Sequence, residues 1–323
     1  MTAAKDAART ILALLTCWVA RISSARAGIA LVYHRIGDTA GNPHFEILPA
    51  VSSDVFDRQL RHLRRRYRVV PATELLEAVR ERRRGERFPA SITFDDDLAS
   101  HLEDAVPALQ LEGLPATFFL GGVSLREPHP LWWEDLQKAI DERLVQPDAL
   151  PHVAEADLRS ALERSPKAIF RVAGTIEQLG QSEREETAVE LRAAVGPAAR
   201  NDGLRTDHVR SLVGAGFDVG FHTFRHDLLP GLSDTALAEA MREGREELER
   251  VTGRPLDVIS YPYGKADDRV AQAAGKAGFT RGFTTKRTAV GEETDPLLIP
   301  RIPPAMSLGK TALRLARAVV PWS

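Results

Sequence analysis

Three consecutive aspartates, Asp95, Asp96 and Asp97, follow the short apolar stretch 90–94. The apolar stretch is typical of a buried strand. Adjacent carboxylates repel one another and are costly to desolvate, so a buried strand that ends in three of them needs compensation. A bound metal cation is the simplest compensation. The alternative is a solvated turn in which an aspartate caps the helix that follows.

Two histidines, His222 and His226, lie four residues apart directly after a second apolar stretch, residues 217–221. Two histidines at this spacing can point at one metal ion, and a carboxylate from the aspartate run supplies a third ligand. This set leaves a coordination position open for water, as in catalytic sites. Zinc fits it best, and iron, cobalt, nickel and manganese are the alternatives. An adjacent aspartate is then free to accept a proton from the bound water.

Other polar residues follow apolar stretches in the same way. His34 follows residues 29–33, Tyr263 lies just after residues 257–261, and Arg301 follows residues 298–299. Apolar stretches alternate with helical patterns, which predicts a mainly parallel sheet, and about eight candidate strands favour a closed or distorted α/β barrel. The carboxyl ends of parallel strands share one rim of a barrel, so we expect these residues to lie on that rim.

Residues 126–202 interrupt this alternation with a helix-rich stretch, which we interpret as an insertion in a barrel that spans residues 28–305. The insertion follows the carboxyl end of a strand, so we expect it to form a cap beside the active-site rim. Its pair Trp132 and Trp133 is more typical of helix packing than of a sugar-binding platform.

Residues 1–27 are expected to form an amphipathic helix that is too short to span a bilayer. Its apolar face comprises Ile11, Leu14, Leu15, Trp18, Val19 and Ile22. The helix either docks on the barrel or lies on a membrane surface. Lys5, Arg9 and the Ala-Arg-Ala run at 25–27 also resemble a weak signal peptide, which we disfavour.

Residues 306–323 predict a second amphipathic helix, whose apolar face of Leu308, Ala312, Leu315 and Val319 would also suit work at a membrane surface. The expected location is the cytoplasm, with contact to the inner face of the membrane. Export through the N-terminal segment is the alternative.

Composition excludes some classes of protein. The chain of 323 residues has a net charge of −2, so it lacks the excess of positive charge that is typical of proteins that bind nucleic acid. Its one cysteine excludes a disulfide framework and a multi-cysteine zinc site. The oligomeric state does not follow from these data.

Three runs resemble, in order, the first three motifs of the polysaccharide deacetylases, carbohydrate esterase family four. These runs are Thr-Phe-Asp-Asp at 93–96, His-Thr-Phe-Arg-His at 222–226 and Tyr-Pro-Tyr-Gly at 261–264. The resemblance covers roughly residues 28–125 and 203–305. It implies a distorted β/α barrel that removes N-acetyl groups from amino sugars. By match to the motifs, Asp95 would be the base, Asp96, His222 and His226 the metal ligands, and the Tyr263 backbone N–H a donor to the oxyanion.

The chain departs from the family pattern at several positions. Asp97 replaces a usual glycine, and Ser260 replaces the arginine that orients the base, for which Arg301 is the candidate substitute. The late Leu-x-His motif that supplies the acid in many members is absent. The run Tyr-His-Arg-Ile at 33–36 resembles the first-strand motif of the branch acting on exopolysaccharides of β-linked N-acetylglucosamine, which implies that His34 is the acid.

The expected function is therefore metal-dependent hydrolysis of an N-acetyl group from an amino sugar in a glycan or a glycan precursor. A deacetylase or deformylase of a lipid-linked or nucleotide-linked sugar is one alternative. A non-catalytic barrel that binds glycans is another, although the intact residues Asp95, Asp96, His222 and His226 argue against it.

Overall fold

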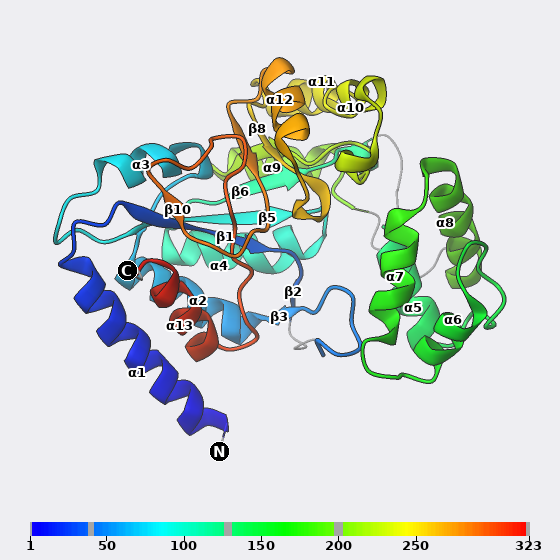
Figure 1. The fold of residues 1–323 in the computed structure, drawn as a ribbon, viewed down its shortest axis with the longest axis horizontal. Helices are drawn as coiled ribbons and strands as arrows, with labels where there is room; N and C mark the ends of the chain where they lie inside the picture. Colours follow the sequence, from blue (N-terminus) through cyan, green and yellow to red (C-terminus); the bar gives the residue numbers. More distant parts are fainter. Residues whose placement is uncertain (1, 38–41, 126–130, 197–202, 321–323) are drawn as a thin grey trace.

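The computed structural model describes residues 2–37, 42–125, 131–196 and 203–320. Its main part is a curled sheet with surrounding helices, and a group of four helices, α5 to α8, lies at the right of Figure 1. This mixed α/β architecture with a curled parallel sheet confirms the predicted fold class.

The main sheet has eight strands in the described part of the chain, in the order β10-β1-β5-β6-β7-β8-β9, with β4 paired to β5. All its pairs are parallel except β1 with β10. A small second sheet pairs two further strands, β2 and β3. The bounds are β1 (Ala27–Tyr33), β2 (Ile36–Gly37), β3 (Val51–Ser52), β4 (Arg68–Val69), β5 (Pro89–Asp95), β6 (Thr117–Leu120), β7 (Asp218–Phe221), β8 (Val258–Ser260), β9 (Arg281–Phe283) and β10 (Val290–Gly291).

Residues 299–302 bridge β1 and β9 of the curled sheet, and the sequence predicts a regular strand over 298–302. Only isolated bridges form there, from Ile299 to Phe283 and from Ile302 to Leu31. The amide of Ile302 donates to the carbonyl of Ala30 at 2.8 Å. This segment closes the distorted barrel, and it places Arg301 at the rim.

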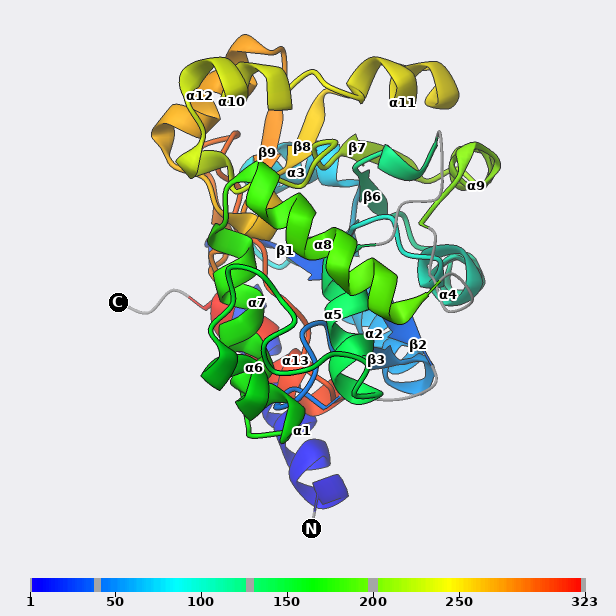
Figure 2. The ribbon, with the colours of Figure 1, turned by 90° about the vertical axis from the view of Figure 1, so that its right-hand side faces the viewer.

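Helices α2, α3, α4, α9, α10, α11 and α12 accompany the strands (Figures 1 and 2). Their bounds are α2 (Ser53–Arg66), α3 (Leu75–Glu81), α4 (Val106–Glu112), α9 (Thr206–Gly214), α10 (Asp234–Ala240), α11 (Arg245–Thr252) and α12 (Asp268–Lys276). The sequence predicts one long helix over residues 233–252, but the structure has two, α10 and α11, because the chain breaks at Gly244, where φ is +77°. A Cβ there would lie 2.5 Å from the Phe224 ring, so only glycine fits.

The insertion consists of α5 (Trp132–Asp141), α6 (Glu155–Leu162), α7 (Ala168–Gln178) and α8 (Gln181–Val195). No strand occurs within its described residues, 131–196. These helices enclose a hydrophobic cluster separate from that of the barrel, and its members include Leu136, Ile140, Leu158, Val172 and Leu191. The insertion therefore has a core of its own.

The terminal helices α1 (Thr2–Arg21) and α13 (Leu308–Ala318) pack against each other. The contact uses small residues, including Ala13, Ala312 and Ala316. The amide of Gly309 donates to Asp6 Oδ2 at 3.0 Å. A Cβ on Gly309 would lie 2.2 Å from the Asp6 carbonyl oxygen, so the glycine permits this close approach.

Residues 1–27 were expected either to dock on the barrel or to lie on a membrane surface. Helix α1 does pack against the protein, but not through its predicted apolar face: Ile11, Leu15, Trp18, Val19 and Ile22 are exposed, and Leu14 is half-buried. The apolar face of α13 was expected to suit a membrane surface, and this expectation is wrong. Ala312, Leu315 and Val319 are buried within the protein and cannot face a membrane. Among the described residues, no helix is long and apolar enough to cross a bilayer.

Candidate active site

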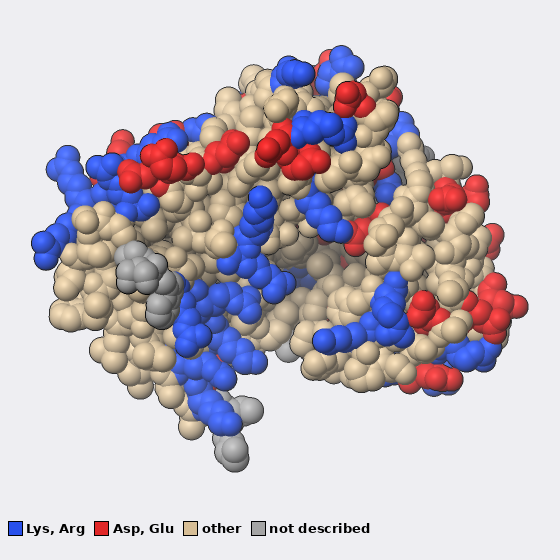
Figure 3. Space-filling view, in the orientation of Figure 1, with Lys and Arg blue, Asp and Glu red and all other residues tan. Residues whose placement is uncertain are grey.

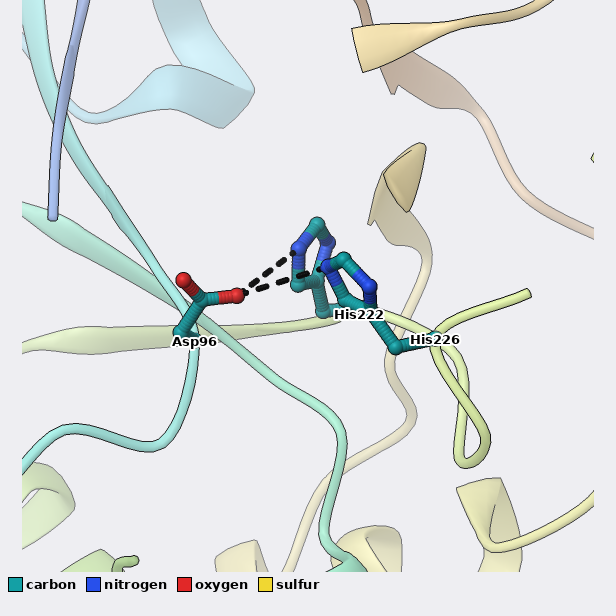
Figure 4. Close-up of side chains that lie close together, drawn as sticks. All are labelled: Asp96, His222 and His226. Atoms are coloured by element: carbon teal, nitrogen blue, oxygen red, sulfur yellow. Dashed lines mark ion pairs between the residues drawn. The ribbon is translucent and has the colours of Figure 1, made fainter. Parts of the chain in front are cut away.

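The candidate metal ligands come from two strand ends. Asp96 follows β5, and His222 and His226 follow β7. Asp96 Oδ1 lies 3.5 Å from the Nε2 atoms of both His222 and His226, and the three candidate ligand atoms lie within 4.8 Å of one another (Figure 4). A carboxylate and two imidazoles in such a cluster form a donor set that fits a divalent cation such as zinc.

The second nitrogen of His222 is held by the next strand. His222 Nδ1 lies 2.8 Å from the carbonyl oxygen of Ser260, so Nδ1 carries the proton and Nε2 is left free as a ligand. Burial alone would lower the pKa of His222, but the negative charges of Asp95 and Asp96 raise it above its ordinary value. In the absence of a cation, the carboxylates therefore favour a proton on this imidazole.

Asp95 is held in place by Arg301. The two terminal nitrogens of the guanidinium donate to the two oxygens of Asp95, each at 2.6 Å, and both side chains are buried. Burial alone would raise the pKa of Asp95, but the charges of Arg301 and His222 lower it. The carboxylate is thus ionised and fixed in orientation beside the candidate ligands.

Ser260 explains how Arg301 reaches this position. The Ser260 hydroxyl accepts a hydrogen bond from Arg301 Nη2 at 2.6 Å and donates to Asp95 Oδ2 at 3.0 Å. A small side chain at position 260 leaves space for a guanidinium that arrives from residue 301. The structure therefore places Arg301 against Asp95, where we expected a substitute for the missing arginine.

Asp97 does not belong to the donor set. Its two oxygens accept hydrogen bonds from the amides of Gly121 and Gly122, at 2.9 and 3.0 Å. Burial raises the pKa of Asp97 to about 6, against the effect of those two amides. The third carboxylate of the run thus ties the end of β5 to the end of β6.

A cavity of about 250 Å³ opens over these groups. From the barrel, it is lined by His34, Asp95, Asp96, His222, His226 and Tyr263, among others. The insertion contributes Trp132 and Trp133 from α5, and Ala173 and Glu177 from α7. All the predicted site residues except Arg301, which lies behind Asp95, therefore face one cavity.

The cap makes direct contact with the candidate ligands. The ring centroid of Trp133 lies 4.8 Å from that of His226, and the ring centroid of Tyr263 lies 4.6 Å from that of His226. The tryptophan pair thus packs against the site and also lines it, a role that its sequence pattern alone did not favour.

Backbone strain gathers at the same place. Asp96, Thr223, His226 and Tyr263 have φ between 52° and 73°, the left-handed region that non-glycine residues rarely adopt. Such conformations persist only where the surroundings hold them, and they are concentrated at functional sites. The sequence marks these positions as parts of the motifs, but it predicts neither their backbone conformation nor the contacts of Ser260.

Comparison with known proteins gives a consistent assignment. The family model described as "Polysaccharide deacetylase" matches residues 82–282, which include every predicted site residue except His34 and Arg301. A curated relative, YxkH of Bacillus subtilis (strain 168), is 23% identical over 99 residues, 31% of this chain. That match spans only 36% of the length of the relative.

Solved structures share the fold. The deacetylase PplD of Streptococcus pyogenes, solved with acetate, is 16% identical, with a TM-score of 0.61 and coverage of 93% of this chain and 100% of that one. IcaB from Ammonifex degensii is 17% identical, with a TM-score of 0.58 and coverage of 93% and 98%. The polysaccharide deacetylase BC0361 of Bacillus cereus is 19% identical, with a TM-score of 0.56 and coverage of 91% and 69%. With a family match over more than half of its residues, this chain belongs to the polysaccharide deacetylase family.

Proposed function

We propose that this protein is a metal-dependent deacetylase of N-acetylated amino sugars. One observation carries the proposal: the cluster of Asp96, His222 and His226 lies in a cavity next to Asp95, which Arg301 holds as an ionised carboxylate. The family membership supports the same class of reaction.

Asp96, His222 and His226 would hold the cation, and zinc suits their two nitrogens and one carboxylate best. A divalent cation at this position would polarise the acetamide carbonyl and lower the pKa of a water molecule. The hydrogen bond from His222 Nδ1 to Ser260 and the strained backbone at Asp96 and His226 preorganise the donors.

Asp95 and His34 would move the protons. Asp95 accepts a proton from the attacking water, and the bidentate contact with Arg301 keeps the carboxylate ionised and fixed at the edge of the cavity. His34 lines the same cavity and donates a proton to the amine nitrogen as the C–N bond breaks. The backbone N–H of Tyr263 is the proposed donor to the developing oxyanion.

The cap restricts the substrate. Trp132 and Trp133 offer apolar ring faces to a sugar, and Glu177 adds a polar group opposite the barrel wall. A cavity of about 250 Å³ suits a sugar unit bound at the end of a glycan or on a lipid-linked or nucleotide-linked precursor better than a long stretch of polymer.

The test is to incubate the zinc-loaded protein with N-acetylated oligosaccharides and lipid-linked amino sugars, and to measure by mass spectrometry the loss of one acetyl group. The matched control is Asp95→Asn. We expect acetyl loss with the wild type only. Binding of a glycan by the metal-loaded protein without acetyl loss from any substrate would contradict the proposal and favour a non-catalytic glycan-binding barrel.

A further inference from the structure

Helix α1 presents a continuous row of large apolar side chains to solvent. We refer to Ile11, Leu12, Leu15, Trp18, Val19 and Ile22 as the α1 stripe, and each of them is between 47% and 67% exposed. At 100° per residue, they fall on one side of the helix. Five of them lie on α1, and Ile22 lies in the turn that directly follows it. Six large apolar side chains exposed together indicate an interaction surface.

Helix α1 is packed against the protein through the side opposite to the α1 stripe. Ala13, Cys17 and Ala20 lie on the opposite side of α1 and are buried or half-buried; Ala13 and Cys17 pack with α13. The helix is therefore already fixed to the protein through its small residues. In both ribbon views α1 is at the periphery, and in Figure 1 its N-terminal end projects beyond the barrel.

Basic residues accompany the α1 stripe. Helices α1 and α13 contain six lysines and arginines and one acidic residue, Asp6, although the whole chain has a net charge of −2. Asp6 accepts a hydrogen bond from the amide of Gly309, so it is occupied within the protein. The positive charge is therefore local to these two helices.

The exposed side of α13 is basic along its length. Lys310, Arg314 and Arg317 follow helical spacing and are exposed, while the buried side of α13 faces the barrel and α1. In Figure 3 a band of blue side chains crosses this part of the molecule and continues down along α1. Exposed apolar residues on one helix, combined with exposed basic residues on the helix that packs against it, are typical of a surface that binds an anionic bilayer.

We propose that α1 and α13 together form a peripheral membrane-binding surface, in which the α1 stripe enters the interfacial layer of an anionic lipid bilayer and the basic residues of α13 contact the lipid headgroups. Apolar insertion and electrostatic attraction act together in such surfaces, and either alone binds weakly. Binding would place a deacetylase beside lipid-linked or membrane-bound glycans, although the proposal does not depend on the activity.

A second copy of the chain is a poorer occupant of this surface. In a two-fold dimer through the α1 stripe, the same patch contributes from both subunits, so the two sets of basic residues approach each other. An anionic bilayer carries the opposite charge. Charge complementarity therefore favours a lipid bilayer over a second copy of the chain as the partner of this surface.

The test is sedimentation of the full-length protein with vesicles of phosphatidylglycerol and phosphatidylcholine, and with vesicles of phosphatidylcholine alone. We expect binding to the anionic vesicles that weakens as salt is added. Leu15→Glu with Trp18→Glu should lower the partition coefficient at least about tenfold. Lys310→Gln with Arg314→Gln and Arg317→Gln should lower it roughly ten- to a hundredfold and reduce the salt dependence.

Two control variants carry comparable apolar-to-acidic and basic-to-neutral changes elsewhere. Leu111 and Val189 are 78% and 49% exposed outside α1, and their replacement by glutamate should leave vesicle binding unchanged. The same holds for Arg242→Gln with Arg250→Gln and Lys276→Gln, which remove three exposed charges near α10 to α12. Melting temperatures establish that every variant is folded.

Two results would overturn the proposal. One is a folded wild type that fails to sediment with anionic vesicles at low salt. The other is a dimer in sedimentation velocity that Leu15→Glu with Trp18→Glu dissociates, because the α1 stripe would then bind a second copy of the chain.

Discussion

The rim of the barrel and the helical cap line the same cavity, but they are built differently. Rim residues stand at strand ends and are fixed by buried hydrogen bonds, such as those between Asp95 and Arg301 and between His222 and Ser260. Cap residues such as Trp132 stand on helices that have a separate hydrophobic core. This difference supports the proposed division of roles, in which the rim carries out the reaction and the cap selects the substrate.

Polar contacts also join the two regions. Lys265, which follows the Tyr-Pro-Tyr-Gly run, lies 2.8 Å from Glu177 of α7, and Arg184 of α8 forms a buried pair with Asp227. The cap is thus docked through side chains, whereas the rim is part of the sheet. Substitutions in the cap should therefore alter binding more readily than the catalytic step.

The largest effect is expected at the rim, from Asp95→Asn. Because the amide cannot accept the proton, kcat should fall roughly 10²–10⁴-fold, the usual range for a general base. Bound metal, measured by elemental analysis, should remain. If the variant instead loses its metal, the roles of Asp95 and Asp96 are exchanged.

A second effect at the rim is expected from His34→Ala. Without an acid for the leaving amine, kcat should fall about a hundredfold or more, while metal content and melting temperature stay close to those of the wild type. The three quantities are measured on the same preparation. Normal turnover combined with a lower melting temperature would show that His34 is a structural residue.

A smaller effect of a different kind is expected in the cap, from Trp132→Ala. Loss of an aromatic face should raise KM about tenfold with little change in kcat. Phe170→Ala on α7 is the control, since this exposed aromatic residue does not line the cavity. A large fall in kcat with unchanged KM would remove the distinction between the cap and the rim.

The smallest effect concerns the barrel at acidic pH. Burial lowers the pKa of His62 on α2 to about 4, from an ordinary value of 6.5. Between about pH 6.5 and pH 4, His62 is therefore protonated in the unfolded chain but neutral in the folded barrel. The free energy of unfolding falls as the pH drops through this window, because the unfolded chain binds one more proton. His62→Leu should reduce that loss by roughly 1–3 kcal/mol. Calorimetric melting at several pH values measures it, and an identical pH dependence in both proteins would contradict the assignment.

Much of the rim could be predicted from the sequence, because the residues that follow parallel strands all lie at one edge of the sheet. On this basis we expected Asp95, Asp96, His222 and His226 to lie together, with Arg301 nearby. It could not show that Ser260 makes space for Arg301 or that Asp97 binds two backbone amides, since both depend on contacts between distant segments.

The errors have a common cause. The apolar pattern of α1 was compatible with a docking face or with a membrane-binding face, but it could not show that α1 packs through the small residues Ala13 and Cys17, which let helices approach closely. The helical pattern over 233–252 continued through Gly244, where the neighbouring Phe224 ring requires a break. Periodicity reports which residues are apolar, and packing decides which of them are covered.

The most direct test of the central claim is the metal content of His222→Ala beside that of the wild type, after both are loaded with zinc and dialysed. His208→Ala, on α9 and away from the cavity, is the control. We predict one divalent ion per chain in the wild type and in the control, and loss of that ion from His222→Ala with the melting transition retained. Full retention of the metal by His222→Ala would contradict the assignment of Asp96, His222 and His226 as its ligands.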